Sequence, residues 1–164
     1  MNGHRVWRLG ADIDTDALAP GQWMQHGMDE LAAHCLESLR PEFAQEVQPG
    51  DVIVAGPNFG IGSSREQAAG VLRHLGVAAV VAPSFAGLFF RNAFNLGLLL
   101  LTCPDCERIA EDETIGFDAR AGRIVRADGE LLAIQPIPAF LLDMVEAGGL
   151  LPQLQRRFPA RTPP

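Results

Sequence analysis

The sequence contains no lysine, and all thirteen of its basic residues are arginine. A phosphate-binding P-loop is therefore excluded, because that motif needs Gly-Lys-Ser/Thr. Long apolar runs are also absent, and the longest, 96–102, is far too short to cross a bilayer. The N-terminus lacks a basic stretch followed by an apolar one, so no signal peptide is predicted. We expect a cytoplasmic protein without a membrane anchor.

The chain length and net charge narrow the class of protein further. The 164 residues carry a net charge of −7, which argues against a general nucleic-acid surface. Of the residues, 48% are apolar and 20% are charged, which is an ordinary globular balance. We expect a single domain over 1–157 that buries roughly 70% of its unfolded surface, followed by a Pro-rich tail at 158–164.

The three cysteines do not form a recognisable metal set. Cys103 and Cys106 have the spacing of a redox pair or of half a zinc site. No second Cys or His pair follows at a suitable distance, so a structural role is favoured. Cys35 falls on an apolar helix face, and His34 and His74 lack ligand-spaced neighbours. A thiol–disulfide function stays open and would require a low-pKa thiolate.

Hydrophobic periodicity predicts alternating elements. Helices are predicted near 29–39 and at 64–75 and 85–95, and buried strands at 51–55, 77–82 and 98–102. The resulting strand–helix–strand–helix–strand order favours parallel pairing with right-handed crossovers. Farther along, a hairpin joins 123–126 to 131–134, and a last helix covers 138–147. The predicted class is α/β with a mostly parallel core sheet.

The most distinctive stretch is 59–68, which reads Phe-Gly-Ile-Gly-Ser-Ser-Arg-Glu-Gln-Ala. It follows a predicted strand and opens a predicted helix. Such a turn directs unpaired backbone N–H groups and the positive end of the helix dipole at one spot. Arg65 adds a positive charge there, so the stretch predicts a binding site for a carboxylate or phosphate.

A plain helix cap is the alternative explanation of this stretch. Ser63 precedes Glu66 by three residues, and Ser64 precedes Gln67 by three, so both pairs fit a capping box. A dinucleotide-binding fingerprint is excluded because Arg65 stands where its third glycine is needed. Spacing alone does not separate the cap from the anion site.

An acidic stretch near the N-terminus is the second unusual feature. Asp12, Asp14 and Asp16 alternate within 10–16. A calcium loop is not supported, because the glycine and distal glutamate of that motif are missing. The stretch is either a solvated turn or a place where one carboxylate turns inward to orient Arg65 or a bound substrate.

Several motifs in chain order carry a resemblance to a known family. They are Asp14-Thr15-Asp16 with Pro20, then Gly60-x-Gly62-Ser63-Ser64-Arg65-Glu66, then Ser84-Phe85-Ala86 with Asn92 and Gly97-Leu98-Leu99. In this order they resemble the small subunit of 3-isopropylmalate dehydratase, which is itself similar to the swivelling C-terminal domain of aconitase and homoaconitase. The match spans nearly the whole chain, and its Gly-Ser-Ser-Arg-Glu element is highly specific to this superfamily.

The resemblance implies a swivelling β/β/α domain, with a smaller β layer, that caps a separate large subunit. It places a [4Fe-4S] cluster on three cysteines of that large subunit, and none on this chain, which lacks the three-cysteine pattern. The implied reaction is stereospecific dehydration and rehydration of a substituted malate, as in leucine biosynthesis. By the same resemblance Ser63 is the base, Ser64 and Arg65 bind a substrate carboxylate, and Asp14 or Asp16 lies nearby.

The assigned base is chemically reasonable. A serine alkoxide is very unstable in water, but a helix N-terminus, an arginine and shielding by the partner would favour it strongly.

Two departures from the family bear on specificity. Family members commonly have His where Gln67 stands. Relatives also carry Tyr-Leu-Arg-Thr or a similar tetrapeptide, whose third residue helps select the substrate's variable arm, where this chain has Trp-Met-Gln-His at 23–26. Gln25 in place of arginine disfavours tricarboxylates such as homoaconitate, whereas 3-isopropylmalate, citraconate or dimethylmaleate would fit. Plain packing of Trp23 and Met24 is an equal alternative.

Besides the thiol–disulfide function, the sequence thus leaves hypotheses of two classes. The first is the small subunit of an iron–sulfur hydro-lyase, acting on 3-isopropylmalate or, alternatively, as a hydratase subunit on citraconate or dimethylmaleate. The second is a non-catalytic small-anion-binding module. The identity of the large subunit, the oligomeric state and a biosynthetic or catabolic role are left open.

Overall fold

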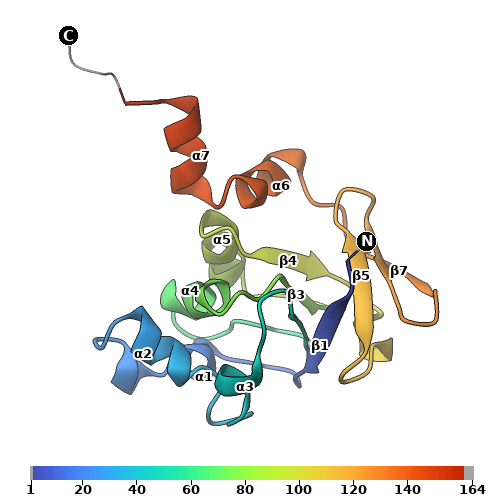
Figure 1. The fold of residues 1–164 in the computed structure, drawn as a ribbon, viewed down its shortest axis with the longest axis horizontal. Coiled ribbons are helices and arrows are strands. Elements are labelled where there is room, and N and C mark those ends of the chain that lie inside the picture. The colour runs from blue at the N-terminus through green and yellow to red at the C-terminus, as the bar shows by residue number, and fades with distance from the viewer. Residues whose placement is uncertain (1, 161–164) are drawn as a thin grey trace.

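A curled seven-stranded mixed sheet forms the centre of the computed structural model, which describes residues 2–160. The strand order is β4-β3-β2-β1-β5-β6-β7 (Figure 1). Strands β1 to β4 pair in parallel, and β1-β5, β5-β6 and β6-β7 pair antiparallel. This confirms the α/β class with a mostly parallel core and a smaller β layer.

The strands are β1 (His4–Arg8), β2 (Val52–Val54), β3 (Ala79–Ala82), β4 (Leu99–Thr102), β5 (Thr114–Asp118), β6 (Arg123–Val125) and β7 (Leu131–Ala133). The α-helices are α1 (Thr15–Leu18), α2 (Met28–Ala33), α3 (Phe43–Glu46), α4 (Gln67–His74), α5 (Gly87–Asn95), α6 (Ala139–Glu146) and α7 (Leu150–Arg157). Two 3₁₀ helices, η1 (Gly21–Trp23) and η2 (Cys106–Arg108), complete the set.

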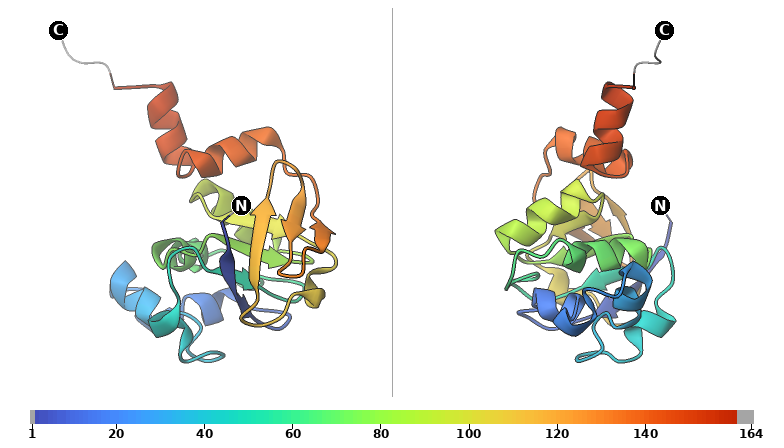
Figure 2. Two further views of the ribbon diagram at one scale, coloured as in Figure 1. Left: turned by 45° about the vertical axis from the view of Figure 1, so that its right-hand side comes forward. Right: turned by 90° about the vertical axis from the view of Figure 1, so that its left-hand side faces the viewer.

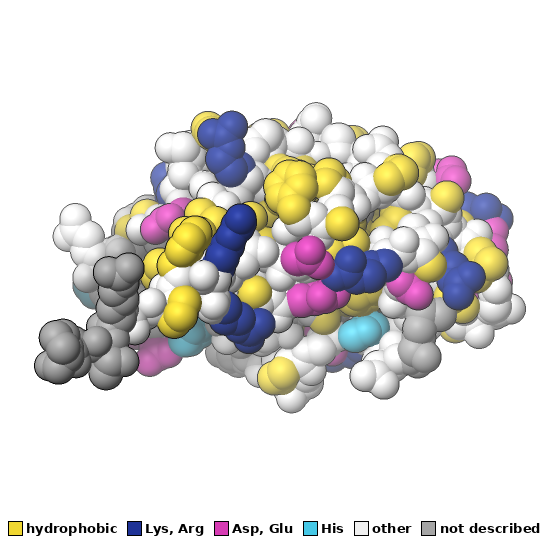
Figure 3. Space-filling view, turned by 90° about the horizontal axis from the view of Figure 1, so that it is seen from above, with side chains coloured by type: hydrophobic (Ala, Val, Ile, Leu, Met, Phe, Trp, Pro, Cys, Tyr) yellow, Lys and Arg dark blue, Asp and Glu magenta, His cyan; other side chains and the backbone are white. Residues whose placement is uncertain are grey.

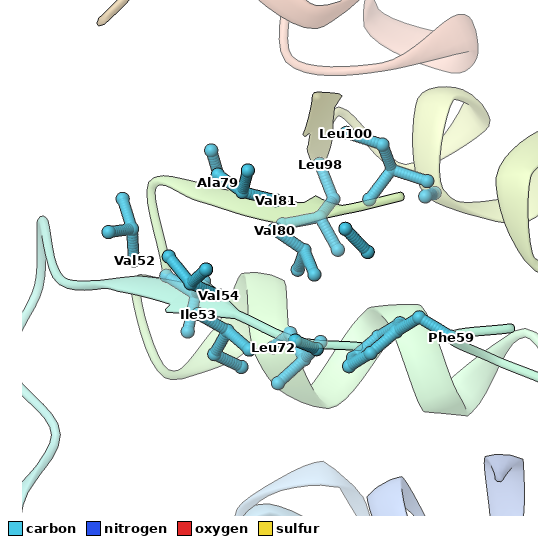
Figure 4. Packing of buried hydrophobic residues seen from close by; sticks show 14 of the residues in the cluster. Val52, Ile53, Val54, Phe59, Leu72, Ala79, Val80, Val81, Leu98 and Leu100 are labelled. Carbon is cyan, nitrogen blue, oxygen red and sulfur yellow. The ribbon is translucent and has the colours of Figure 1, made fainter. Parts of the chain in front are cut away.

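The core lies between the parallel strands and the helices that cover them. Strands β2, β3 and β4 are buried almost throughout, as expected for strands covered on both faces. Figure 4 shows Leu72 of α4 and Phe59 beside the valines of β2 and β3. The three predicted core strands and the predicted hairpin are confirmed, because continuous runs of Val, Ala and Leu leave few alternatives.

Two predicted helices have the wrong limits. Helix α2 ends at Ala33, not near 39, because Leu36 has φ +59° and donates its N–H to Ala17 O instead of continuing the helix. Helix α4 begins at Gln67, not at Ser64, because the preceding loop is tied to the N-terminal segment, as described below. Strands β1 and β5 and helix α7 were not predicted at all.

Helix α7 packs against α5 and α6 and projects from the rest of the molecule (Figure 2). It exposes Leu151 and Leu154 near its arginines, and Phe158 is exposed just after its end. Apolar and basic side chains gather on the face seen in Figure 3. Of the predicted tail, 161–164 lies outside the described residues, and the single-domain boundary at 157 stays a prediction. None of the helices within 2–160 has both the length and the apolar character needed to cross a membrane.

Candidate functional site

The acidic stretch and the glycine loop run side by side beyond the ends of β1 and β2. Backbone hydrogen bonds of 2.7–3.0 Å join 10–15 to 56–61, including Gly60 N to Ile13 O and Thr15 N to Ile61 O. These bonds extend the parallel pairing of the two strands as single contacts. Residues separated by about fifty positions are thereby brought to one place.

Two glycines allow this close approach. Gly60 has φ +86°, and a Cβ there would lie 2.2 Å from the Phe89 ring. Gly62 has φ +106°, and a Cβ there would lie 3.1 Å from Thr15 Oγ1. Positive φ and the lack of space both require glycine at these positions. The following residue, Ser63, is consequently held against the start of α1.

Ser63 Oγ has hydrogen-bond partners on two sides. Arg65 Nε donates to it at 2.7 Å, and Thr15 Oγ1 lies 3.1 Å away. Thr15 Oγ1 also accepts the Ser63 N–H at 3.1 Å, so its own proton is available for Ser63 Oγ. Ser63 is exposed, whereas Thr15 is only 2% exposed. The arginine N–H, together with a threonine hydroxyl that is able to donate, favours negative charge on the serine oxygen.

Asp16 and a backbone carbonyl fix the Arg65 guanidinium. Arg65 Nη1 donates to Ala19 O at 2.8 Å and to Asp16 Oδ1 at 3.2 Å. The Arg65 side chain is 23% exposed, whereas that of Asp16 is 70% exposed. One of the acidic residues thus does turn towards Arg65, as one of the two alternatives for that stretch requires. The guanidinium keeps Nη2 for a further acceptor.

The other predicted site residues lie near this group with different contacts. Asp14 caps α1, accepting the Ala17 N–H at 2.7 Å. Ser64 is exposed, and its carbonyl accepts from Asn92 Nδ2 at 3.1 Å. Gln25 is exposed in the turn that follows η1, and within 2–160 no hydrogen bond joins it to 63–65. The structure therefore groups Ser63, Arg65 and Asp16 closely and leaves Gln25 apart.

The capping-box explanation is wrong. Glu66 is the N-cap of α4, has αR geometry and makes no side-chain capping bond. Ser63 and Ser64 precede the first helical residue by four and three positions. The Ser63 hydroxyl meets Thr15 and Arg65 instead.

Sequence reasoning gave no role to Thr15. Its position between two acids was the one signal available in the sequence. In the structure Thr15 is one of only two buried polar or charged residues in the described chain. Its contact with Ser63 depends on the pairing of the two loops, which sequence spacing does not specify.

The cysteines are unsuited to redox chemistry. Cys35, Cys103 and Cys106 are buried and unbridged, and Cys106 Sγ donates to Ala55 O at 3.5 Å. Burial raises the pKa of the Cys106 thiol to about 11 and also raises the pKa of Cys103. A low-pKa thiolate is therefore not provided. Among residues 2–160, no three His, Cys, Asp or Glu side chains cluster as metal ligands.

Comparison with known proteins places this geometry in a class. The aconitase C-terminal domain model matches residues 36–106. A crystal structure of 3-isopropylmalate dehydratase from Methanocaldococcus jannaschii superimposes with a TM-score of 0.88 at 36% identity, covering 94% of this chain and 93% of that one. The fold is thus that of the aconitase C-terminal domain.

The curated relatives define the family within that class. A 3-isopropylmalate dehydratase small subunit from Archaeoglobus fulgidus is 46% identical over 90% of this chain and 92% of its own length. A homoaconitase small subunit from Methanothermobacter thermautotrophicus is 44% identical over 90% of this chain and 86% of its own. The chain belongs to the family of 3-isopropylmalate dehydratase small subunits, whose enzymes are hydro-lyases. The resemblance inferred from the motifs is confirmed.

Proposed function

We propose that this chain is the small subunit of a heteromeric iron–sulfur hydro-lyase that interconverts 3-isopropylmalate and 2-isopropylmalate through isopropylmaleate. The observation that carries the proposal is the 2.7 Å hydrogen bond from Arg65 Nε to Ser63 Oγ. It holds a cationic donor against an exposed serine oxygen, as a serine base requires. The names of the relatives from A. fulgidus and M. jannaschii support the substrate.

Ser63 acts as the base in this proposal. Its alkoxide takes the proton from the carbon next to a substrate carboxylate and becomes a hydroxyl again. The C–H electron pair forms the double bond as the substrate hydroxyl leaves the neighbouring carbon as hydroxide, taking the C–O bonding pair with it. Donation from Arg65 and Thr15 stabilises the alkoxide before the proton arrives. Hydration of the other carbon reverses these steps and yields the isomer.

Arg65 and Ser64 bind a substrate carboxylate. Arg65 Nη2 supplies the donor for the carboxylate, while Asp16 and Ala19 O hold Nη1. A charge-assisted contact of this kind contributes about 2–3 kcal/mol. The Ser64 hydroxyl is exposed beside it. Asp14 contributes by capping α1, which carries Thr15 and Asp16.

In this proposal the iron–sulfur cluster is bound by the large subunit. The cysteines of this chain do not fit an iron–sulfur cluster, because all three are buried and no three ligands converge within 2–160. We therefore assign the [4Fe-4S] cluster to a large subunit, with which this chain is active, and assign no step to it here. Partners such as nucleic acid or membranes are not expected, and a cytoplasmic location stays a prediction.

The substrate's variable arm is the finer part of the proposal. Gln25 lacks the charge that would bind a third carboxylate, which favours the isopropyl arm over the longer acidic arm of homoaconitate. Citraconate and dimethylmaleate are the alternative substrates with short apolar arms. The 44% identity to a homoaconitase small subunit means that overall identity does not decide between these substrates.

The test is anaerobic turnover by the chain co-expressed with its large subunit, followed by absorbance of the unsaturated acid. We expect turnover of 3-isopropylmalate, with citraconate, dimethylmaleate and homoaconitate as comparisons. Turnover of a methylated maleate alone would replace the substrate assignment. Ser63→Ala should abolish turnover, with Ser38→Ala, at an exposed position, as the control serine. If none of the four substrates is turned over although the iron–sulfur cluster is intact, the non-catalytic anion-binding module would instead be favoured.

A further inference from the structure

The rings of Trp23 and His34 stack beside the candidate site. Their centroids are 3.8 Å apart and their planes differ by 2°. Trp23 is the last residue of η1, and His34 is the C-cap of α2. The stack therefore joins the loop 20–27 to the end of a helix.

Two carboxylates fix the His34 ring. Nδ1 lies 2.5 Å from Glu37 Oε2, and Nε2 lies 3.2 Å from Glu30 Oε1. Only the protonated imidazole donates from both nitrogens. The hydrogen bond to Glu37 raises the pKa of His34, partial burial opposes this, and Glu30 adds to the rise. A protonated ring over an indole face also gains a cation–π attraction.

The other charged groups around the stack have partners or lie farther away. His26, on the same loop as Trp23, has its ring centroid 5.4 Å from that of Trp23. Helix α4, which packs against α2, presents His74, and this residue pairs with Asp29 at 2.8 Å. Glu30 and Glu37 are therefore the charges that act on His34.

The anchored loop borders the catalytic group. Gly21 N donates to Asp16 Oδ1 at 3.0 Å, and the same oxygen meets Arg65 Nη1 at 3.2 Å. A surface hollow of about 340 Å³ lies between Asp16, which contacts Arg65, and Glu37, which contacts His34. It is lined by Asp16, Pro20, Gly21, Gln22, Glu37 and Ser38. Movement of the loop at Gly21 would therefore move the carboxylate that orients Arg65.

The loop is otherwise held by apolar packing, because Trp23 and Met24 are partly buried against the core. None of the residues of η1 is buried, and Gln25 to Gly27 are exposed. Trp23 Nε1 is buried without a hydrogen-bond partner in the described chain. Trp23 is thus held by packing rather than by a side-chain hydrogen bond, against the core and against the His34 ring.

We propose that His34 is a positioning residue of the site. Clamped between Glu30 and Glu37, it holds Trp23 by stacking and so sets the loop 20–27 against Asp16. The link to catalysis rests on the proposed function, but the clamp itself does not.

The pH dependence follows from the direction of the pKa shift. A raised folded-state pKa means that the clamp stabilises the loop fully below the unfolded pKa of His34. This contribution is lost as pH rises through the folded pKa. The loop should loosen on the alkaline side.

The clamp can be tested on the full chain by tryptophan fluorescence against pH, since only Trp7 and Trp23 contribute. Protonated imidazole quenches a stacked indole, so emission should rise in one step as His34 loses its proton. The step should vanish in His34→Phe, which keeps an aromatic ring, and in Trp23→Phe. His26→Gln, which removes the other imidazole close to Trp23, should keep it, and so should His74→Gln, which breaks the ion pair between α4 and Asp29 of α2. No step in the wild type, or a step that survives in His34→Phe, would overturn the clamp.

Turnover with the large subunit tests the positioning. His34→Ala should lower kcat/KM by about tenfold at neutral pH, because misplacement of binding groups is costly. His34→Phe should recover most of this loss and remove the alkaline decline of the wild type, and His74→Gln should change neither. An active complex indifferent to His34→Ala would overturn the positioning alone. An inactive wild-type complex that still shows the fluorescence step would overturn the proposed function and the positioning, but not the clamp.

Discussion

Arg65 Nε donates a 2.7 Å hydrogen bond to Ser63 Oγ, a residue only two positions before it in the chain. Such a short-range contact would be poorly ordered if the Arg65 side chain had no other partner. Here Nη1 of the same guanidinium is bound by Asp16 and by the Ala19 carbonyl. A donor anchored at its far end needs little reorganisation when charge develops on the serine oxygen, which is the basis of electrostatic preorganisation.

Replacing Arg65 by Lys should therefore impair catalysis despite retaining the charge. An ammonium group cannot reach Ser63, Asp16 and a substrate carboxylate with the fixed geometry of a guanidinium. We expect kcat/KM to fall about 10²–10³-fold, measured on the complex with the large subunit. Arg91→Lys, at an exposed position on α5, is the matched control. Equal activity of the two variants would show that the fork geometry of Arg65 is irrelevant.

Thr15→Val should show whether the buried Thr15 hydroxyl supports catalysis or only the stability of the fold. Valine has nearly the same shape, so the core should tolerate it, but the Ser63 N–H and Oγ both lose a partner. We expect kcat to fall about tenfold or more, in line with loss of one hydrogen bond to a charged group. Thr15→Ser should restore most of the rate. A purely structural Thr15 would instead lower the urea midpoint and leave kcat unchanged.

Asp51 should be a strong determinant of stability. Its Oδ2 accepts hydrogen bonds from Trp7 Nε1 and from Gln48 N, each at 2.9 Å, and Asp51 is only 6% exposed. Asp51→Ala leaves the buried indole N–H unpaired, so we expect a loss of about 2–4 kcal/mol in the free energy of unfolding. Asp51→Asn, which keeps an acceptor oxygen, should lose less. Urea titration would decide, and similar losses for both variants would contradict the hydrogen-bond explanation.

Cysteine alkylation should be slow in the native protein. With its pKa raised to about 11, Cys106 is only about 0.1% thiolate at pH 8, and burial restricts access as well. We expect all three cysteines to react with iodoacetamide in denaturant, but almost none over the same time in the folded chain. Mass spectrometry gives the number of alkylated cysteines. Rapid native labelling of Cys103 or Cys106 would reopen the thiol–disulfide hypothesis.

The sequence predicted the sheet best where burial leaves one solution. Apolar runs at β2, β3 and β4 identify strands covered on both faces, and Gly129 in a polar turn identifies the β6–β7 hairpin. Strand β1 was missed because only Val6 and Trp7 are buried, between polar neighbours. Strand β5 was missed because Gly116 interrupts its pattern. Both strands are defined by pairing across the fold, which local propensity does not encode.

The site was predictable by type and less so by geometry. The glycine loop, Ser63 and Arg65 could be named from the sequence, because glycine at forced turns and charge beside hydroxyls are visible there, and the structure places Ser63 and Arg65 in contact. The contact of Asp16 with Arg65 was left as one of two alternatives. The contribution of Thr15 and the Trp23–His34 stack require knowledge of which loops lie together. These contacts depend on long-range pairing, so no window of sequence contains them.

The central place of β1 has a consequence for synthesis of the chain. This strand pairs in parallel with β2 on one side and antiparallel with β5 on the other. During translation β1 leaves the ribosome before its second neighbour, at 114–118, which follows more than a hundred residues later. The two halves of the sheet can therefore join only late, and the free edge of β1 is open to wrong pairing until then. An N-terminal fusion that occupies this edge should slow folding more than a C-terminal one.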